Sequence, residues 1–172
     1  FISYYLSNVD SVIGPVGYFP APVEALQNSA KALMAATGAG ESGTMLDLGL
    51  AEVNPLDVKG DIITAGSSTV FPLSEAVAEK FRDEGYGGNI TIDSIGSGAG
   101  LERFCKTGET DIANASRAIK ASEVESCAAI GRTPIEFRVG TDALAIVVNP
   151  ANDWIEDAIV ADLAKIFSKD TT

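Results

Sequence analysis

The hydrophobic positions between residues 61 and 85 change from a strand-like to a helix-like spacing. The stretch DIITAGSSTV (61–70) has the apolar character of a strand and ends in a Gly-Ser-Ser-Thr turn. The stretch FPLSEAVAEKFRDEG (71–85) predicts a helix that Gly85 stops. Its apolar residues follow a helical spacing: Phe71, Val77, Ala78 and Phe81.

The same alternation of strand and helix continues to the end of the chain. After residue 85 we predict strands at 89–98, 110–119 and 135–150 and helices at 99–109, 121–131 and 154–168. The stretch IEFRVGTDALAIVVNP (135–150) is long and apolar, which is typical of a strand buried on both faces. Strands alternating with helices of this length predict an α/β fold, with a doubly wound, mostly parallel sheet and helices on both faces.

The first sixty residues have a different pattern. FISYYLSNVDSVIG (1–14) and PVEALQNSAKALMAATG (22–38) read as two helices joined by a Pro/Gly turn, and GAGESGT (38–44) has the composition of a linker. We therefore predict three parts. They are a helical segment at 1–37, a junction at 38–59 and an α/β lobe at 60–172.

Composition narrows the possible functions. The chain has 172 residues, a net charge of −12 and no histidine. The acidic balance argues against nucleic-acid binding, which needs a basic face. The lack of histidine excludes imidazole metal sites and catalytic groups that depend on histidine.

Export is compatible with the sequence. No apolar run approaches the length of about 20 residues that a membrane span needs, so we expect no direct membrane insertion. The first residues lack the pattern of a signal peptide, so we expect that any export signal was removed or was never part of this chain. Cys105 and Cys127 are candidates for a disulfide, with two reduced core thiols as the alternative.

Three turns rich in small and hydroxyl residues follow three predicted strands, and each supplies what an oxyanion needs. Glycines allow close approach of the backbone, hydroxyls donate hydrogen bonds, and the unpaired N–H groups of the following helix carry the positive end of its dipole. Each turn alone is equally an ordinary helix cap. Since all three follow strand carboxyl ends, where α/β sheets bind ligands, we predict a shared anion site. Its candidate residues are Ser67, Ser68, Thr69, Ser97, Gly98, Ser116, Arg117 and Asp142.

The two charged candidates each have two interpretations. Arg117 is the basic residue that lies directly in a turn, and it either clamps an oxyanion in bidentate fashion or forms a surface ion pair. Asp142 interrupts an apolar stretch. It either accepts a proton from a protonated oxyanion, which would favour phosphate over sulfate, or caps the chain or pairs with Arg138.

We find no sequence signature of catalysis. GSGAG (96–100) is followed by no Gly-Lys-Ser/Thr, and Leu101 stands where a dinucleotide fingerprint has its third glycine. No acidic cluster predicts a metal site, and we expect no cofactor. An enzyme acting on phosphorylated substrates is therefore a minor alternative.

Four segments, in this order, resemble lobe 1 of the PstS-type periplasmic phosphate-binding proteins, the substrate-binding components of ABC importers with the two-lobed type II fold. They are ITAGSSTVFPLSEAVAEKF, IDSIGSGAGLERF, TDIANASRAIK and GTDALAIVVNP, and the likeness covers about residues 60–168. The resemblance implies inorganic phosphate as ligand, held by Ser68, Thr69 and Ser97, and an ABC permease as partner of the parent protein. It implies a periplasmic or extracellular location for that parent. In the third turn Arg117 follows Ala115-Ser116, where one version of the motif has an Asp.

The segment FISYYLSNVDSVIGPVGYFPAPVEALQNSAKAL is similar to the carboxy-terminal helices of the same family. The order of segments therefore resembles a circularly permuted, isolated lobe 1, and the rearrangement indicates either an engineered protein or a natural gene rearrangement. We expect weak or no phosphate binding by such a lobe, and a homodimer through the exposed cleft face. The alternatives are a structural module without ligand and a binder of sulfate, molybdate or a phosphonate.

Overall fold

The computed structural model describes residues 1–38, 48–152 and 157–168. The predicted linker lies largely outside the described residues. In order, the elements are α1 (Ile2–Val16), β1 (Phe19–Pro20), α2 (Val23–Thr37), the 3₁₀ turn η1 (Pro55–Asp57), β2 (Ile62–Gly66), α3 (Phe71–Asp83), β3 (Ile90–Ser94), α4 (Ser97–Glu102), the π-helical turn η2 (Arg103–Thr107), β4 (Ile112–Asn114), α5 (Ala121–Ala129), β5 (Gly140–Thr141) and α6 (Val160–Phe167). In these ranges no helix combines the length and the apolar content that a membrane crossing requires.

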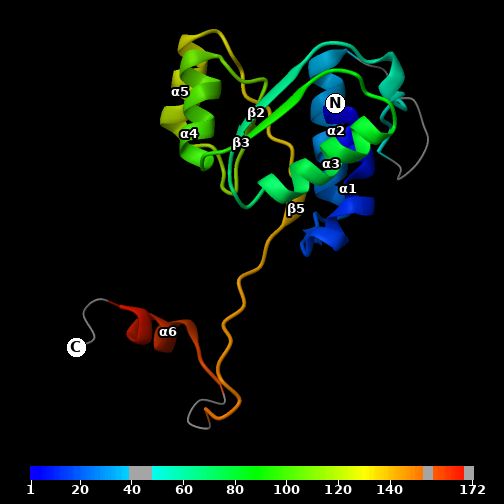
Figure 1. The fold of residues 1–172 in the computed structure, drawn as a ribbon. Coiled ribbons are helices and arrows are strands. Elements are labelled where there is room, and N and C mark those ends of the chain that lie inside the picture. The colour runs from blue at the N-terminus through cyan, green and yellow to red at the C-terminus, as the bar shows by residue number, and fades with distance from the viewer. Residues whose placement is uncertain (39–47, 153–156, 169–172) are drawn as a thin grey trace.

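The main sheet is parallel and has the strand order β3-β2-β4. β2 is the first of the three along the chain and lies in the middle, so the two crossovers run in opposite directions. Right-handed crossovers in opposite directions place their helices on opposite faces of a sheet. Figure 1 shows α3 with α1 and α2 on one side of the strands, and α4 with α5 on the other. The predicted α/β class with a parallel sheet and helices on both faces is confirmed.

Local sequence explains where α3 begins. The Ser67 hydroxyl accepts hydrogen bonds from the N–H groups of Thr69 and Val70, at 3.2 and 3.4 Å. Its carbonyl oxygen accepts from the N–H of Phe71 at 3.1 Å, so Ser67 satisfies donors of the turn that leads into the helix. Pro72 lies in the first turn of the helix, where its missing N–H costs no helical hydrogen bond. The strand-turn-helix pattern read from the sequence is therefore a real helix start.

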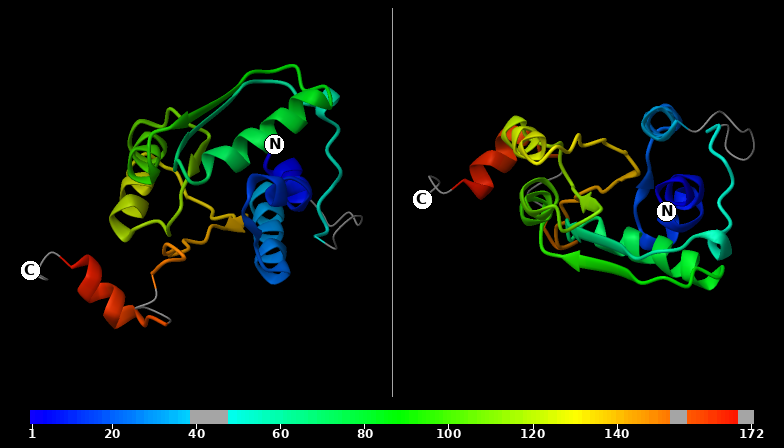
Figure 2. Two further views of the ribbon diagram at one scale, coloured as in Figure 1. Left: turned by 60° about the horizontal axis from the view of Figure 1, so that its bottom comes forward. Right: turned by 90° about the horizontal axis from the view of Figure 1, so that it is seen from above.

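The N-terminal helices complete the hydrophobic core. α1 packs along α3 and α2, and the core places Leu6, Val9 and Ile13 of α1 with Phe81 of α3 out of contact with solvent. Figure 2 shows α1 beside both helices in two orientations. β1 pairs in antiparallel fashion with β5, which joins this region to the chain after α5. Residues far apart in sequence thus form one core.

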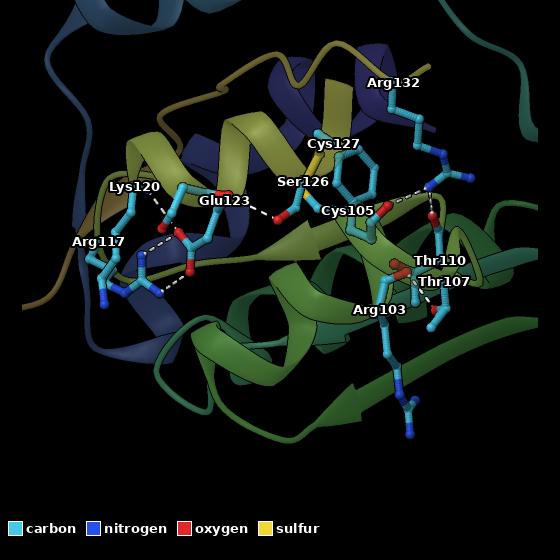
Figure 3. Close-up of a disulfide and its surroundings, with 12 residues drawn as sticks. Arg103, Cys105, Thr107, Thr110, Arg117, Lys120, Glu123, Ser126, Cys127 and Arg132 are labelled. Atoms are coloured by element: carbon cyan, nitrogen blue, oxygen red, sulfur yellow. Dashed lines mark hydrogen bonds and ion pairs between the residues drawn. A yellow bond between two sulfur atoms is a disulfide. The ribbon is translucent and has the colours of Figure 1, made fainter. Parts of the chain in front are cut away.

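A disulfide connects the two helical segments on the other face of the sheet. Cys105 of η2 and Cys127 of α5 are bonded, with an S–S distance of 2.06 Å, and both are buried (Figure 3). Cys127 is the single buried residue of α5. Nearby, the Arg132 guanidinium donates hydrogen bonds to the carbonyl oxygens of Phe104, Gly108 and Thr110 and lies 5.0 Å from the centre of the Phe104 ring. The disulfide and Arg132 therefore hold α5 and the chain after it against η2.

The C-terminal segment, defined as residues 143–152 and 157–168, differs from the prediction. The strand expected at 135–150 is reduced to the two residues of β5, and Leu144 and Val147 are 92% and 85% exposed. The helix expected at 154–168 appears as α6, which has no buried residue. Figure 1 shows this part of the chain running away from the packed elements. The buried strand was wrong because an apolar run becomes a buried strand only where neighbouring strands and helices cover it.

Candidate anion-binding site

The three turns meet at the carboxyl ends of β2, β3 and β4. The N–H of Ser67 donates to the carbonyl oxygen of Asn114 at 2.8 Å, which joins the first turn to the third. The N–H groups of Ile95 and Gly96 both donate to the carbonyl oxygen of Gly66, at 2.9 and 2.7 Å, which joins the second turn to the first. The three turns, which follow β2, β3 and β4 along the chain, thus form one surface.

Glycine is required where these backbones approach. A Cβ on Gly66, whose φ is +147°, would lie 2.0 Å from the carbonyl oxygen of Asn114. A Cβ on Gly100, in α4, would lie 2.4 Å from the Cα of Gly66 and 2.5 Å from the carbonyl oxygen of Ala65. Two glycines that look like parts of a phosphate loop therefore serve first to bring α4 and β4 against the end of β2.

Ser97 and Ser116 form a direct contact between the second and third turns. Their hydroxyl oxygens are 3.2 Å apart, and the N–H of Ser116 donates to Ser97 Oγ at 3.1 Å. Ser67 is buried and its hydroxyl serves the start of α3. Among the predicted ligands, Ser67 therefore holds the turn that leads into α3, whereas Ser97 and Ser116 stay at the surface where the turns meet.

Other predicted donors face solvent. Ser68 and Gly98 are exposed and Thr69 is half-buried. Within the described residues, the backbone N–H groups of Ser68 and Gly98 have no protein acceptor. The first and second turns thus each present a backbone donor that an anion at this edge could use.

Arg117 forms an ion pair, which was one of the two roles predicted for it. Its guanidinium donates to both carboxylate oxygens of Glu123, at 2.9 and 2.6 Å (Figure 3). It also donates to the carbonyl oxygen of Ala118. Hydrogen bonds from Arg117 and from the N–H of Lys120 lower the pKa of Glu123 to about 2. Three of the five guanidinium N–H groups are used in this way, so the other two have no acceptor among the described residues.

Asp142 is exposed, and within the described ranges it forms no ion pair with Arg138. It lines a cavity of about 830 Å³, together with Thr69, Ser116 and Arg117. The cavity lies between α1, α3, the sheet and residues 133–142. Four of the predicted site residues therefore border one space, while Ser67, Ser68, Ser97 and Gly98 lie outside its lining.

Sequence reading missed a polar row beneath the turns. Tyr5 of α1, Ser74 of α3 and Asn114 at the end of β4 are buried and in contact. Burial raises the pKa of Tyr5 to about 12, since the charged phenolate is disfavoured there. The signal available in the sequence was the polar Asn114 directly before the third turn, but its partner Ser74 is 40 residues away, and Tyr5, which contacts Ser74, is 69 residues from Ser74.

No group of three or more Cys, Asp and Glu side chains in the described part of the chain could hold a metal ion. The donors that the turns assemble are N–H and hydroxyl groups, which suit an anion.

A parallel sheet covered on both faces, with donor turns gathered at the carboxyl ends of its strands, is the architecture of an α/β ligand-binding domain. The profile of the family described as a PBP superfamily domain matches residues 35–172. The chain therefore belongs to the PBP superfamily.

Individual relatives agree with this family. The chain is 52% identical over 110 residues to "Protein SphX" of Synechococcus elongatus, which covers 63% of this chain and 32% of that protein. It is 33% identical over 139 residues to the "Phosphate-binding protein PstS" of Staphylococcus haemolyticus, which covers 81% of this chain and 42% of the relative. The crystal structure of a possible phosphate binding protein from Planctomyces limnophilus superposes with a TM-score of 0.59 at 40% identity, over 67% of this chain and 40% of that one. The chain thus spans between about a third and two fifths of the length of these proteins.

Proposed function

We propose that this chain is the anion-binding lobe of a phosphate-binding protein that serves an ABC importer. The observation that carries the proposal is the junction of the three turns, where the Ser97 and Ser116 hydroxyls lie 3.2 Å apart and where Ser68 and Gly98 of the first and second turns are exposed. The family, and relatives named as phosphate-binding proteins, support phosphate as the anion. The ligand set we propose is Ser68, Thr69, Ser97, Gly98, Ser116 and Arg117.

The described residues form one side of such a site, and this side is open to solvent. Ser68, Gly98, Ser116 and Arg117 are exposed, so water competes for each hydrogen bond to the anion. The net charge of −12 adds long-range repulsion. We therefore expect weak binding by this chain, with a dissociation constant of about 1 mM or higher.

Titration of the chain with inorganic phosphate at low salt, followed by calorimetry or NMR, tests the proposal. Ser97→Ala should weaken binding about fivefold because it removes one hydroxyl donor and the contact to Ser116. Ser11→Ala is the matched control, since Ser11 is exposed on α1 and its hydroxyl donates only to the carbonyl oxygen of Asn8. Absence of any phosphate response would contradict the proposal and favour a structural module, and a micromolar constant would contradict the open site.

Competition with sulfate tests the role proposed for Asp142. A carboxylate that accepts a proton from hydrogen phosphate repels fully ionised sulfate. We expect Asp142→Asn to reduce the preference for phosphate over sulfate. Equal affinities for the two anions in the unaltered chain would show that Asp142 has no such role.

The segment 1–37 is proposed to correspond to the carboxy-terminal helices of the family, joined ahead of the lobe as in a circular permutation. The packing of α1 against α3 and the pairing of β1 with β5 support this order of segments. We further propose a periplasmic or extracellular location for the parent protein, as its transport role requires.

We also propose a homodimer through the exposed cleft face, where Ser68, Gly98, Ser116 and Arg117 face solvent. We expect light scattering to show a dimer that dissociates on dilution. A monomer across all concentrations would contradict the homodimer.

A further inference from the structure

Asn114 holds a fixed position between the first and third turns. Its carbonyl oxygen accepts the hydrogen bond from the N–H of Ser67 at 2.8 Å, and its backbone lies directly against Gly66 in the β2–β4 pairing. Its side chain is 9% exposed. The side-chain amide therefore lies immediately beneath the surface on which the turns meet.

Two buried hydroxyls set the orientation of this amide. Ser74 donates to Asn114 Oδ1 at 3.4 Å. Because Ser74 has one hydroxyl proton and uses it there, the 3.3 Å contact between the hydroxyls of Tyr5 and Ser74 requires Tyr5 to donate. The direction is thus Tyr5 to Ser74 to Asn114, and it couples α1 to the end of β4 through α3.

The amide nitrogen is left as an unused donor. Oδ1 and Nδ2 lie in the same amide plane on different arms of the group, so Ser74 uses only the acceptor arm, and within the described residues no acceptor bonds to Nδ2. It is also not sealed in the core: across those residues, the fully buried side-chain N and O atoms without a partner are the hydroxyl oxygens of Thr64 and Thr110. Asn114 lines the cavity of about 830 Å³ that Thr69, Ser116 and Arg117 also border.

We propose that the side-chain amide of Asn114 donates a hydrogen bond to the bound oxyanion, and that Tyr5 and Ser74 are positioning residues that orient it. This inference rests on the proposed function, to which it adds a ligand residue and a role for α1. A side-chain amide suits this position because it is neutral, so that it can stay buried without an ion pair, and because it offers two donors.

The test is an NMR titration of the isotopically labelled 172-residue chain with inorganic phosphate. The side-chain amide signals of Asn114 should shift along the same saturation curve as the backbone N–H of Gly98. Asn114→Asp keeps the acceptor for Ser74 and replaces the donor by a carboxylate oxygen, so it should weaken phosphate binding by about tenfold or more.

The positioning residues are tested by conservative variants. Ser74→Ala removes the hydrogen bond to Asn114 Oδ1, and Tyr5→Phe removes the contact that orients the Ser74 hydroxyl. Each should weaken binding about threefold and reduce the phosphate-induced shift of the Asn114 signals. Tyr18→Phe is the matched control, since Tyr18 lines the same cavity and its hydroxyl makes no hydrogen bond to the described residues. We expect it to bind phosphate as the unaltered chain does.

The outcomes separate this inference from the proposed function. If Gly98 responds to phosphate and the Asn114 amide does not, this inference is overturned while the proposed function stands. If no signal responds, both are overturned. Should Asn114→Asp fail to fold, the titration of the unaltered chain decides, with the Asn114 signals assigned by through-bond experiments.

Discussion

The packed part of the molecule and the C-terminal segment contain similar apolar side chains in opposite surroundings. Leu6 of α1 is fully buried between helices, whereas Leu144 is 92% exposed. Val9 and Val147 form a second pair of this kind. The comparison shows that an apolar pattern stabilises a fold only where a complementary surface lies within reach of the chain.

The largest effect should come from the packed side of this comparison. Leu6→Ala should lower the free energy of unfolding by about 4 kcal/mol, because it removes buried methyl groups and leaves a cavity among α1, α2 and α3. Urea unfolding followed by circular dichroism measures this loss. A loss similar to that of Leu144→Ala would show that α1 is not part of the core.

Removal of the disulfide tests α5, which is intermediate between the packed helices and the exposed C-terminal segment because Cys127 is its single buried residue. Replacing both cysteines by alanine should cost about 3 kcal/mol, because the bond closes a loop with a sequence separation of 22. Urea unfolding of the variant and of the oxidised chain gives the difference. If unfolding is unchanged, Arg132 and the Phe104 ring hold α5 without the bond.

Alkaline pH should weaken the packed part through its buried tyrosines. Burial raises the pKa of Tyr5 to about 12, and burial together with Glu84 raises the pKa of Tyr4. The contribution of Tyr5 is therefore complete below its unfolded pKa of about 10 and is lost as the pH rises from there toward 12, with a size of about 2 kcal/mol. Denaturant midpoints between pH 9 and pH 12 measure this loss, which should shrink in Tyr5→Phe.

The smallest effect is expected in the C-terminal segment. Leu144→Ala should change the free energy of unfolding by less than about 0.5 kcal/mol, because its side chain has almost no contacts to lose. The same urea experiment provides the comparison with Leu6→Ala. A cost of several kcal/mol would mean that this segment is buried in solution, by the chain itself or by a second copy.

The strand-turn-helix units were predictable because their signals are local. The apolar spacing of residues 71–85 gave α3, and the glycine-rich turn after β3 gave the start of α4. The sequence also grouped the three turns correctly, since parallel strands bring their carboxyl ends to one edge. The strand at 135–150 failed because burial on both faces depends on other elements.

Within the candidate site, the residue types alone could not show which turn residues are structural and which are available to a ligand. A serine in such a turn is either structural or a ligand, and only the contacts show that Ser67 holds the turn before α3 while Ser97 contacts Ser116. Arg117 was ambiguous in the same way until its contact with Glu123 was known.

The order of apolar and polar residues along this chain was enough to establish an α/β domain with three donor turns at one edge of a parallel sheet. Hydrogen bonds within turns and the spacing of residues on a helix face are short-range, so they can be read directly from the chain. Which side chains are buried, which turn residues still have a free donor, and how Tyr5 reaches Asn114 depended on contacts between residues as far apart as α1 and β4. Such contacts form only when the chain has folded, because the packing geometry of several elements together sets them.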